Sequence, residues 1–110
     1  MINILIYVCH AYGGDKANIE RARKITHDLQ VKDLENCYIC PLLVFSDLEY
    51  GEMGYGDEMN LCIDLLSCSD CLIVASEISN GVKEEIKFAK LVKMEVLRLD
   101  ENGELQPFTE

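Results

Sequence analysis

Short apolar segments alternate along this chain with longer stretches of helical periodicity, and this alternation restricts the fold more than any other feature. The apolar segments predict buried strands at Asn3–Cys9, Cys37–Val44, Cys71–Ala75 and Met94–Leu99, of which the second ends near Pro41. The periodic stretches predict helices at Ala17–Gln30, Asp57–Ser67 and Val82–Lys93. Such alternation indicates an α/β fold in which helices cover both faces of a mostly parallel sheet. We expect one small Rossmann-like or flavodoxin-like three-layer sandwich with four to five strands, spanning residues 1–110 and ending in an acidic tail at 100–110.

The charge balance narrows the range of partners. The chain has 20 acidic residues against 10 Lys and Arg, a net charge of −10, and no Lys or Arg from Asp33 to Val82. Such a surface repels phosphate backbones and anionic lipids, so we expect neither nucleic-acid nor membrane binding. No apolar run approaches the ~20 residues of a membrane-spanning helix. The opening run Ile2–Cys9 lacks a basic flank, so we expect no signal peptide and a cytoplasmic protein.

Six cysteines include two CxxC pairs, Cys37–Cys40 and Cys68–Cys71, which raise the question of a four-thiolate zinc site. Residues three apart in a strand point to opposite faces, and neither pair has the glycine-bearing turn of a zinc knuckle. We favour buried, reduced thiols over a zinc or redox site. We expect no metal and no cofactor.

Three loops that follow predicted strands, at 10–15, 41–56 and 76–81, are the loops richest in Gly, Ser, Asn and Tyr residues. In a parallel sheet these loops meet at the carboxyl ends of the strands, where ligands bind. A backbone-cradled phosphate could lie at the Gly-Gly turn or at the start of the third helix, although both features also serve as plain turns and caps. The candidate ligand-binding residues are His10, Tyr12, Gly13, Gly14, Ser79, Asn80, Gly81, Tyr50 and Tyr55.

Glu85 is the residue whose position most calls for an explanation. It falls at i+3 of the apolar stripe Val82, Ile86, Ala89 and Val92, so its carboxyl group should face inward from the first turn of its helix. Nearby N–H groups and the helix dipole would keep it ionised. Such a carboxylate is a candidate nucleophile for a sugar carbon. The alternative is a capping Glu that satisfies first-turn N–H groups.

Three motifs resemble the nucleoside 2-deoxyribosyltransferase-like family, which includes small bacterial and phage relatives of deoxynucleoside 5-phosphate N-hydrolases. They are Cys9-His-Ala-Tyr-Gly-Gly14, Cys68-Ser-Asp-Cys-Leu-Ile-Val74 and Ser79-Asn-Gly-Val-Lys-Glu-Glu85-Ile-Lys-Phe-Ala89. The resemblance spans about residues 2 to 99. It implies that Glu85 is the nucleophile and that phosphate or sugar contacts come from Ser79, Gly81 and the Gly13-Gly14 turn. It also implies a homodimer or higher homo-oligomer.

One departure from the family bears on function. Catalytic members usually carry an Asp eight residues before the position of Asp70, where this chain has Cys62; Asp57, Glu58 or Asp64 could substitute. We therefore favour a protein that binds a nucleotide-derived molecule containing ribosyl and phosphate groups. Such a protein could act as a phage anti-defence sponge for a nucleotide immune signal. The alternative is an N-glycosidic hydrolase or transferase with Glu85 as nucleophile, and a vestigial interaction module is the weakest hypothesis.

Overall fold

The computed structural model describes residues 3–46 and 54–109, apart from the side chain of Tyr55. Its strands are β1 (Leu5–Cys9), β2 (Cys37–Ile39), β3 (Cys71–Val74), β4 (Glu95–Leu99) and β5 (Leu105–Pro107). Its helices are α1 (Lys16–Lys32), α2 (Pro41–Val44), α3 (Tyr55–Ser67) and α4 (Asn80–Leu91). The strands form one sheet in the order β2-β1-β3-β4-β5, parallel except for β5. The predicted α/β sandwich is therefore confirmed.

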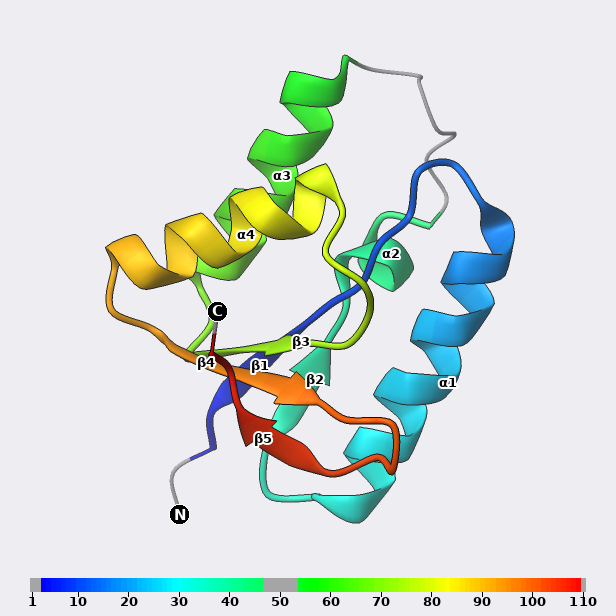
Figure 1. Ribbon diagram of the computed structural model, residues 1–110, viewed down its shortest axis with the longest axis vertical. Helices are drawn as coiled ribbons and strands as arrows, with labels where there is room; N and C mark the ends of the chain where they lie inside the picture. Colours follow the sequence, from blue (N-terminus) through cyan, green and yellow to red (C-terminus); the bar gives the residue numbers. More distant parts are fainter. Residues whose placement is uncertain (1–2, 47–53, 110) are drawn as a thin grey trace.

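The two faces of the sheet carry separate helical layers, α1 with α2 and α3 with α4 (Figure 1). The period-2 geometry of the strands divides the core between them. In β1, Ile6 and Val8 pack with the α1 layer, whereas Tyr7 and Cys9 pack with the α3–α4 layer. Each fully buried aliphatic side chain contributes about 1.5–3 kcal/mol by leaving water, so both layers hold the sheet.

The second strand ends at Ile39, close to Pro41, where the sequence predicts its end. The rest of the apolar segment, from Pro41 to Val44, forms the short helix α2. Proline has no N–H to give to a sheet ladder, and its fixed φ suits the first turn of a helix. The apolar segment 37–44 is therefore divided between a strand and a helix, and the helix was not predicted.

The predicted acidic tail also contains regular structure. Asp100 Oδ1 accepts hydrogen bonds from the N–H groups of Asn102 and Glu104, both at 2.9 Å. Gly103 takes the left-handed φ of 79° that closes the turn. The chain then returns as β5, antiparallel to β4 with Leu105 opposite Leu99.

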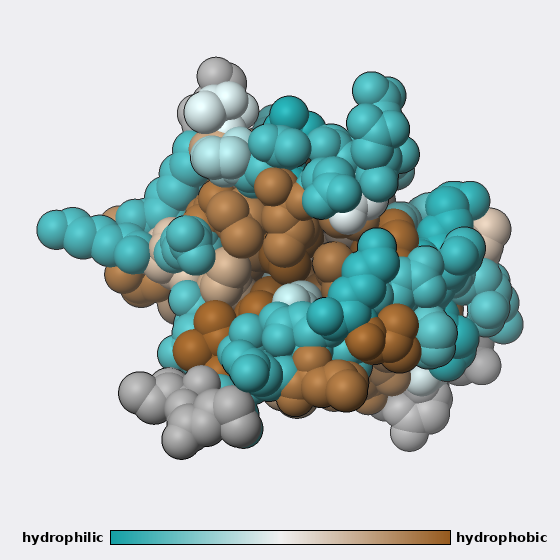
Figure 2. All heavy atoms as spheres, turned by 90° about the horizontal axis from the view of Figure 1, so that it is seen from below, coloured by the Kyte–Doolittle hydropathy of each residue, from teal (hydrophilic) through white to brown (hydrophobic). Residues whose placement is uncertain are grey.

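The outer surface is mixed in character. On the side shown in Figure 2, hydrophobic side chains surround a central hollow and hydrophilic side chains form most of the rim. Leu34, Leu91 and Val92 are among the exposed large hydrophobic residues. Within the described ranges, no helix is both long and apolar enough to cross a membrane.

Candidate functional site

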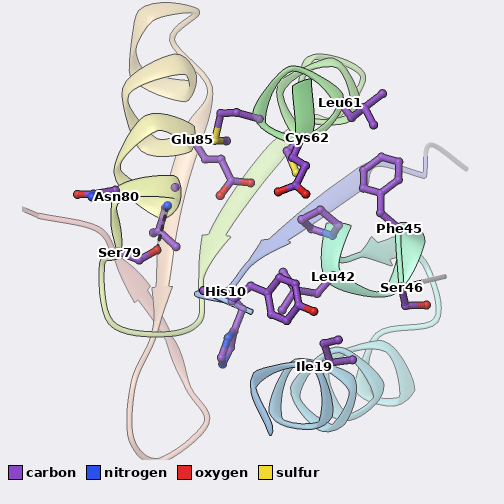
Figure 3. A pocket seen from close by; sticks show the side chains of 17 residues that line it. His10, Ile19, Leu42, Phe45, Ser46, Leu61, Cys62, Ser79, Asn80 and Glu85 are labelled. Atoms are coloured by element: carbon purple, nitrogen blue, oxygen red, sulfur yellow. Dashed lines mark hydrogen bonds between the residues drawn. The ribbon is translucent and has the colours of Figure 1, made fainter. Parts of the chain in front are cut away.

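A cavity of about 370 Å³ lies beyond the carboxyl end of β1, and its wall takes side chains from both helical layers (Figure 3). Here β1 leads to α1 on one face while β3 leads to α4 on the other, which makes a topological switch point. The volume lies within the ~300–1,000 Å³ typical of ligand pockets. The lining residues are His10, Tyr12, Gly13, Ile19, Pro41, Leu42, Phe45, Ser46, Glu58, Met59, Leu61, Cys62, Ser79, Asn80, Gly81, Val82 and Glu85.

Glu85 points from α4 into this cavity, as Figure 3 shows, although its side chain is only 5% exposed. Its inward position, predicted from the apolar stripe, is confirmed by the burial of Val82, Ile86 and Ala89 on the same helix face. Val92 departs from that stripe, because the helix ends at Leu91 and leaves it 50% exposed.

The partners of Glu85 come from β1, not from its own helix. The Tyr7 hydroxyl donates to Oε2, and the Cys9 thiol donates to Oε1 at 3.3 Å. The capping alternative is wrong, because Ser79 caps α4 by accepting a hydrogen bond from the Val82 N–H at 3.3 Å. α4 begins at Asn80, so Glu85 lies in the second turn, beyond the strongest influence of the helix dipole.

These surroundings set the protonation of Glu85. Burial raises its pKa above the usual range, and the hydrogen bonds from Tyr7 and Cys9 offset part of that rise. The prediction that nearby N–H groups and the helix dipole keep Glu85 ionised is wrong. The groups that favour the ionised form are the Tyr7 hydroxyl and the Cys9 thiol, and desolvation outweighs them. A raised carboxyl pKa allows the group either to donate or to accept a proton.

α3 presents Cys62 toward the same cavity as Glu85 (Figure 3). Burial, followed by the proximity of Glu85, raises the pKa of the Cys62 thiol to about 12. The thiol is therefore neutral near pH 7 and is neither a nucleophile nor an effective acid there. Of the three acidic residues considered as substitutes at this position, only Glu58 lines the cavity; Asp57 and Asp64 are exposed.

The loop after β1 forms one border of the cavity. Gly13 and Gly14 take φ values of 60° and 81°, a left-handed conformation that favours glycine. Tyr12 and Gly13 line the cavity, whereas Gly14 is not among its lining residues. His10 is 6% exposed, its Nδ1 lies 2.8 Å from the Ala11 carbonyl oxygen, and its ring is turned away from Glu85 (Figure 3).

The start of α4 forms the facing border. Ser79, Asn80 and Gly81, all predicted from the sequence, line the cavity. The two loops are tied together where the Ala11 N–H donates to Ser76 Oγ at 2.8 Å. Tyr50 and the side chain of Tyr55 lie outside the described part of the chain, so their predicted ligand contacts stay predictions.

An apolar wall completes the cavity and was missed from the sequence. It consists mainly of Ile19, Leu42, Phe45, Met59 and Leu61. Leu42 and Phe45 reach the cavity because residues 41–44 form α2, a helix that was not predicted. Pro41 was the available signal, since a proline after a strand favours the first turn of a helix.

The cysteine pairs do not converge on a metal site. Each CxxC has one exposed and one buried member: Cys37 and Cys68 are exposed, and Cys40 and Cys71 are buried. In residues 3–46 and 54–109, no group of three or more His, Cys, Asp or Glu side chains is placed to hold a metal ion.

Comparison with known proteins gives a family and a fold. A family model described as "Domain of unknown function (DUF7768)" matches residues 4–99, and none of the curated proteins matches the sequence. A conserved protein from Enterococcus faecalis V583 has a similar structure, with a TM-score of 0.73 and 16% identity over 88% of this chain and 63% of that one. A 2-desoxiribosyltransferase from Leishmania mexicana has a TM-score of 0.62 and 19% identity over 88% of this chain and 65% of that one. The chain thus has a deoxyribosyltransferase-like fold and spans less than two thirds of either structure.

Proposed function

This chain belongs to the DUF7768 family, and we propose that its cavity binds a small molecule that contains a ribosyl or deoxyribosyl group. The observation that carries this proposal is the buried Glu85 carboxyl group, which faces a cavity with an otherwise largely apolar wall. Ligand pockets typically combine such a wall with a few placed polar groups. The 2-desoxiribosyltransferase from Leishmania mexicana, which shares the fold, supports a nucleoside-related ligand.

The apolar wall of the cavity suits the base of a nucleoside, and its polar groups suit the sugar. The Phe45 ring and the Leu42 side chain offer a flat apolar surface for a base. Glu85 can accept hydrogen bonds from sugar hydroxyls, and bonds to a carboxylate are about twice as strong as neutral ones. A phosphate would have to rest on N–H groups at the start of α4, because no Lys or Arg is found among the described lining residues.

Cys62 favours binding over turnover. An ordinary nucleobase needs a proton as it leaves a sugar, and the Cys62 thiol, whose pKa burial raises to about 12, does not supply one near pH 7. A protein that holds its ligand without cleaving it removes one ligand molecule per binding site. Sequestration of a nucleotide-derived immune signal, as a phage anti-defence protein would perform, is one use of such binding.

The position of Glu85 also favours a second function, N-glycosidic cleavage or transfer. In that reaction a Glu85 oxygen attacks C1′ of the sugar, the C1′–N bond breaks, and the base leaves with the bonding electrons. Water or a second base then displaces the carboxylate and regenerates the enzyme. Tyr7 and Cys9 would help by lowering the pKa of the attacking carboxyl group.

Mass spectrometry separates the two functions. The purified protein is incubated with nucleosides, deoxynucleoside monophosphates, ADP-ribose derivatives and cyclic nucleotides, and each is measured before and after heat denaturation. Sequestration predicts that a ligand leaves solution and returns intact. Cleavage predicts free base, which is lost in Glu85→Gln and retained in Glu84→Gln, a control at the exposed neighbour on the same helix. No change with any compound would contradict both functions.

A further inference from the structure

Two acidic side chains, Glu58 and Glu85, line the cavity. Glu58 enters from the first turn of α3 and Glu85 from α4, while the described lining residues include no Lys or Arg. The wall around them is mainly apolar. Burial alone disfavours the ionised form of Glu85, and a cation bound beside it would favour that negative form. The cavity therefore disfavours anions and favours a cationic ligand.

The sequence around the cavity reinforces this field. No Lys or Arg occurs from Asp33 to Val82, a stretch that contains ten acidic residues and supplies α2 and α3. With a net charge of −10, the molecule as a whole attracts cations toward its clefts. A bound phosphate would gain little here, because the nearest charged groups of the wall repel it.

Two aromatic side chains suit a particular kind of cation. Tyr12, from the loop after β1, and Phe45, which follows α2, both line the cavity. A flat positively charged ring can lie against the face of an aromatic ring, an interaction worth about 0.5–2 kcal/mol depending on desolvation. A compact, strongly hydrated ammonium group would use this wall less well than a heteroaromatic cation.

We propose that the preferred ligand is a nucleoside whose base carries a permanent positive charge, such as an N-ribosyl pyridinium or an N-alkylated purine nucleoside. This inference rests on the proposed function and adds to it the charge of the ligand. Glu58 and Glu85 hold the cationic base and its sugar, and the aromatic wall contacts the base plane.

A positive charge on the base also removes the need for a proton donor at the position of Cys62. When the C1′–N bond of a pyridinium nucleoside breaks, the bonding electrons go to the ring nitrogen and the base leaves as a neutral molecule. No proton has to be donated to it. Water supplies hydroxide to C1′ and releases one proton to solution, so the step balances with no acid at the position of Cys62. A cationic base thus fits this cavity whether the ligand is held or cleaved.

The test compares two ligands that differ mainly in charge. Ribosyl nicotinamide is a cation, and its 1,4-dihydro form is neutral and nearly isosteric. Their Kd values are measured by calorimetry at low and at 0.5 M salt, beside the neutral nucleosides adenosine, uridine and thymidine. We expect the cation to bind at least tenfold more tightly at low salt, which corresponds to about 1.4 kcal/mol. The preference should shrink at high salt.

Two variants test whether the carboxyl groups of the cavity cause the preference for the cationic ligand. Glu58→Gln should reduce the ratio of the two affinities severalfold, whereas Glu84→Gln, at an exposed position of α4, should leave it unchanged. Equal affinities, or tighter binding of neutral nucleosides, would overturn the inference and leave the proposed function standing. Failure of all five compounds to bind would overturn both.

Discussion

Tyr7→Phe tests the buried pair that supports Glu85. Tyr7 is 0% exposed, and its hydroxyl donates to Glu85 Oε2. The substitution removes one oxygen atom and keeps the ring, so packing in the core is preserved. A hydrogen bond to a charged group contributes about 1.5–3 kcal/mol, and a neutral one about 0.5–1.5 kcal/mol. We therefore expect the free energy of unfolding to fall by about 1 kcal/mol where Glu85 is protonated and by about 2 kcal/mol where it is ionised.

The sign of this pH dependence follows from the pKa of Glu85. Burial raises that pKa and the Tyr7 bond lowers it, so Tyr7→Phe raises it further. A raised carboxyl pKa gives stability that is complete below the unfolded-state value of about 4.3 and is lost as pH rises through the folded-state value. The variant has the higher folded-state pKa and so loses more stability as pH increases. The difference between the two proteins must grow with pH.

Urea unfolding followed by circular dichroism at pH 4, 6 and 8 measures the effect. With an m-value of about 1–3 kcal/mol/M, a loss of 2 kcal/mol moves the midpoint by roughly 1 M. Tyr38→Phe is the matched control, because its hydroxyl donates to Asp33 Oδ2 at 2.8 Å near the surface and should contribute less. A Tyr7→Phe loss that is independent of pH, or no larger than that of the control, would refute the reasoning.

The remaining predictions concern the loops and the thiols. Gly13→Ala should lower the free energy of unfolding by about 1 kcal/mol, because φ is +60° there. Gly56→Ala, in α3 with open space for a Cβ, should raise it by about 0.5 kcal/mol. Thermal unfolding measures both, and similar effects at the two sites would contradict the backbone argument. Ser79→Ala removes the N-cap of α4 and should cost about 1 kcal/mol, a drop of several degrees in Tm, and an unchanged Tm would show that the cap contributes nothing. A thiol reagent should react rapidly with the exposed Cys37 and Cys68 in the folded protein and with the buried cysteines after unfolding; fast modification of a buried cysteine in the folded state would contradict its assigned burial.

The repetition of strand and helix was enough to predict the layered sheet, because buried parallel strands and amphipathic helices have distinct periods. The i+3 spacing also predicted that Glu85 faces inward. Its hydrogen-bond partners could not be predicted in the same way, since Tyr7 lies 78 residues away and meets Glu85 only through the register of the fold. The segment Cys37–Val44 was predicted to be a strand that ends near Pro41. The helical turn that follows, and with it the contribution of Phe45 to the cavity wall, was not predicted.

The cavity is the place where the two helical layers, otherwise separated by the sheet, contribute to one wall. A molecule bound there would contact α1 and α2 on one face of the sheet and α3 and α4 on the other. Unfolding either layer would then require release of that molecule. At a free concentration of one hundred times Kd, this linkage adds about 2.7 kcal/mol to the stability of the whole domain. Ligand binding would thus raise the free energy of unfolding of both layers, even with no movement of the backbone.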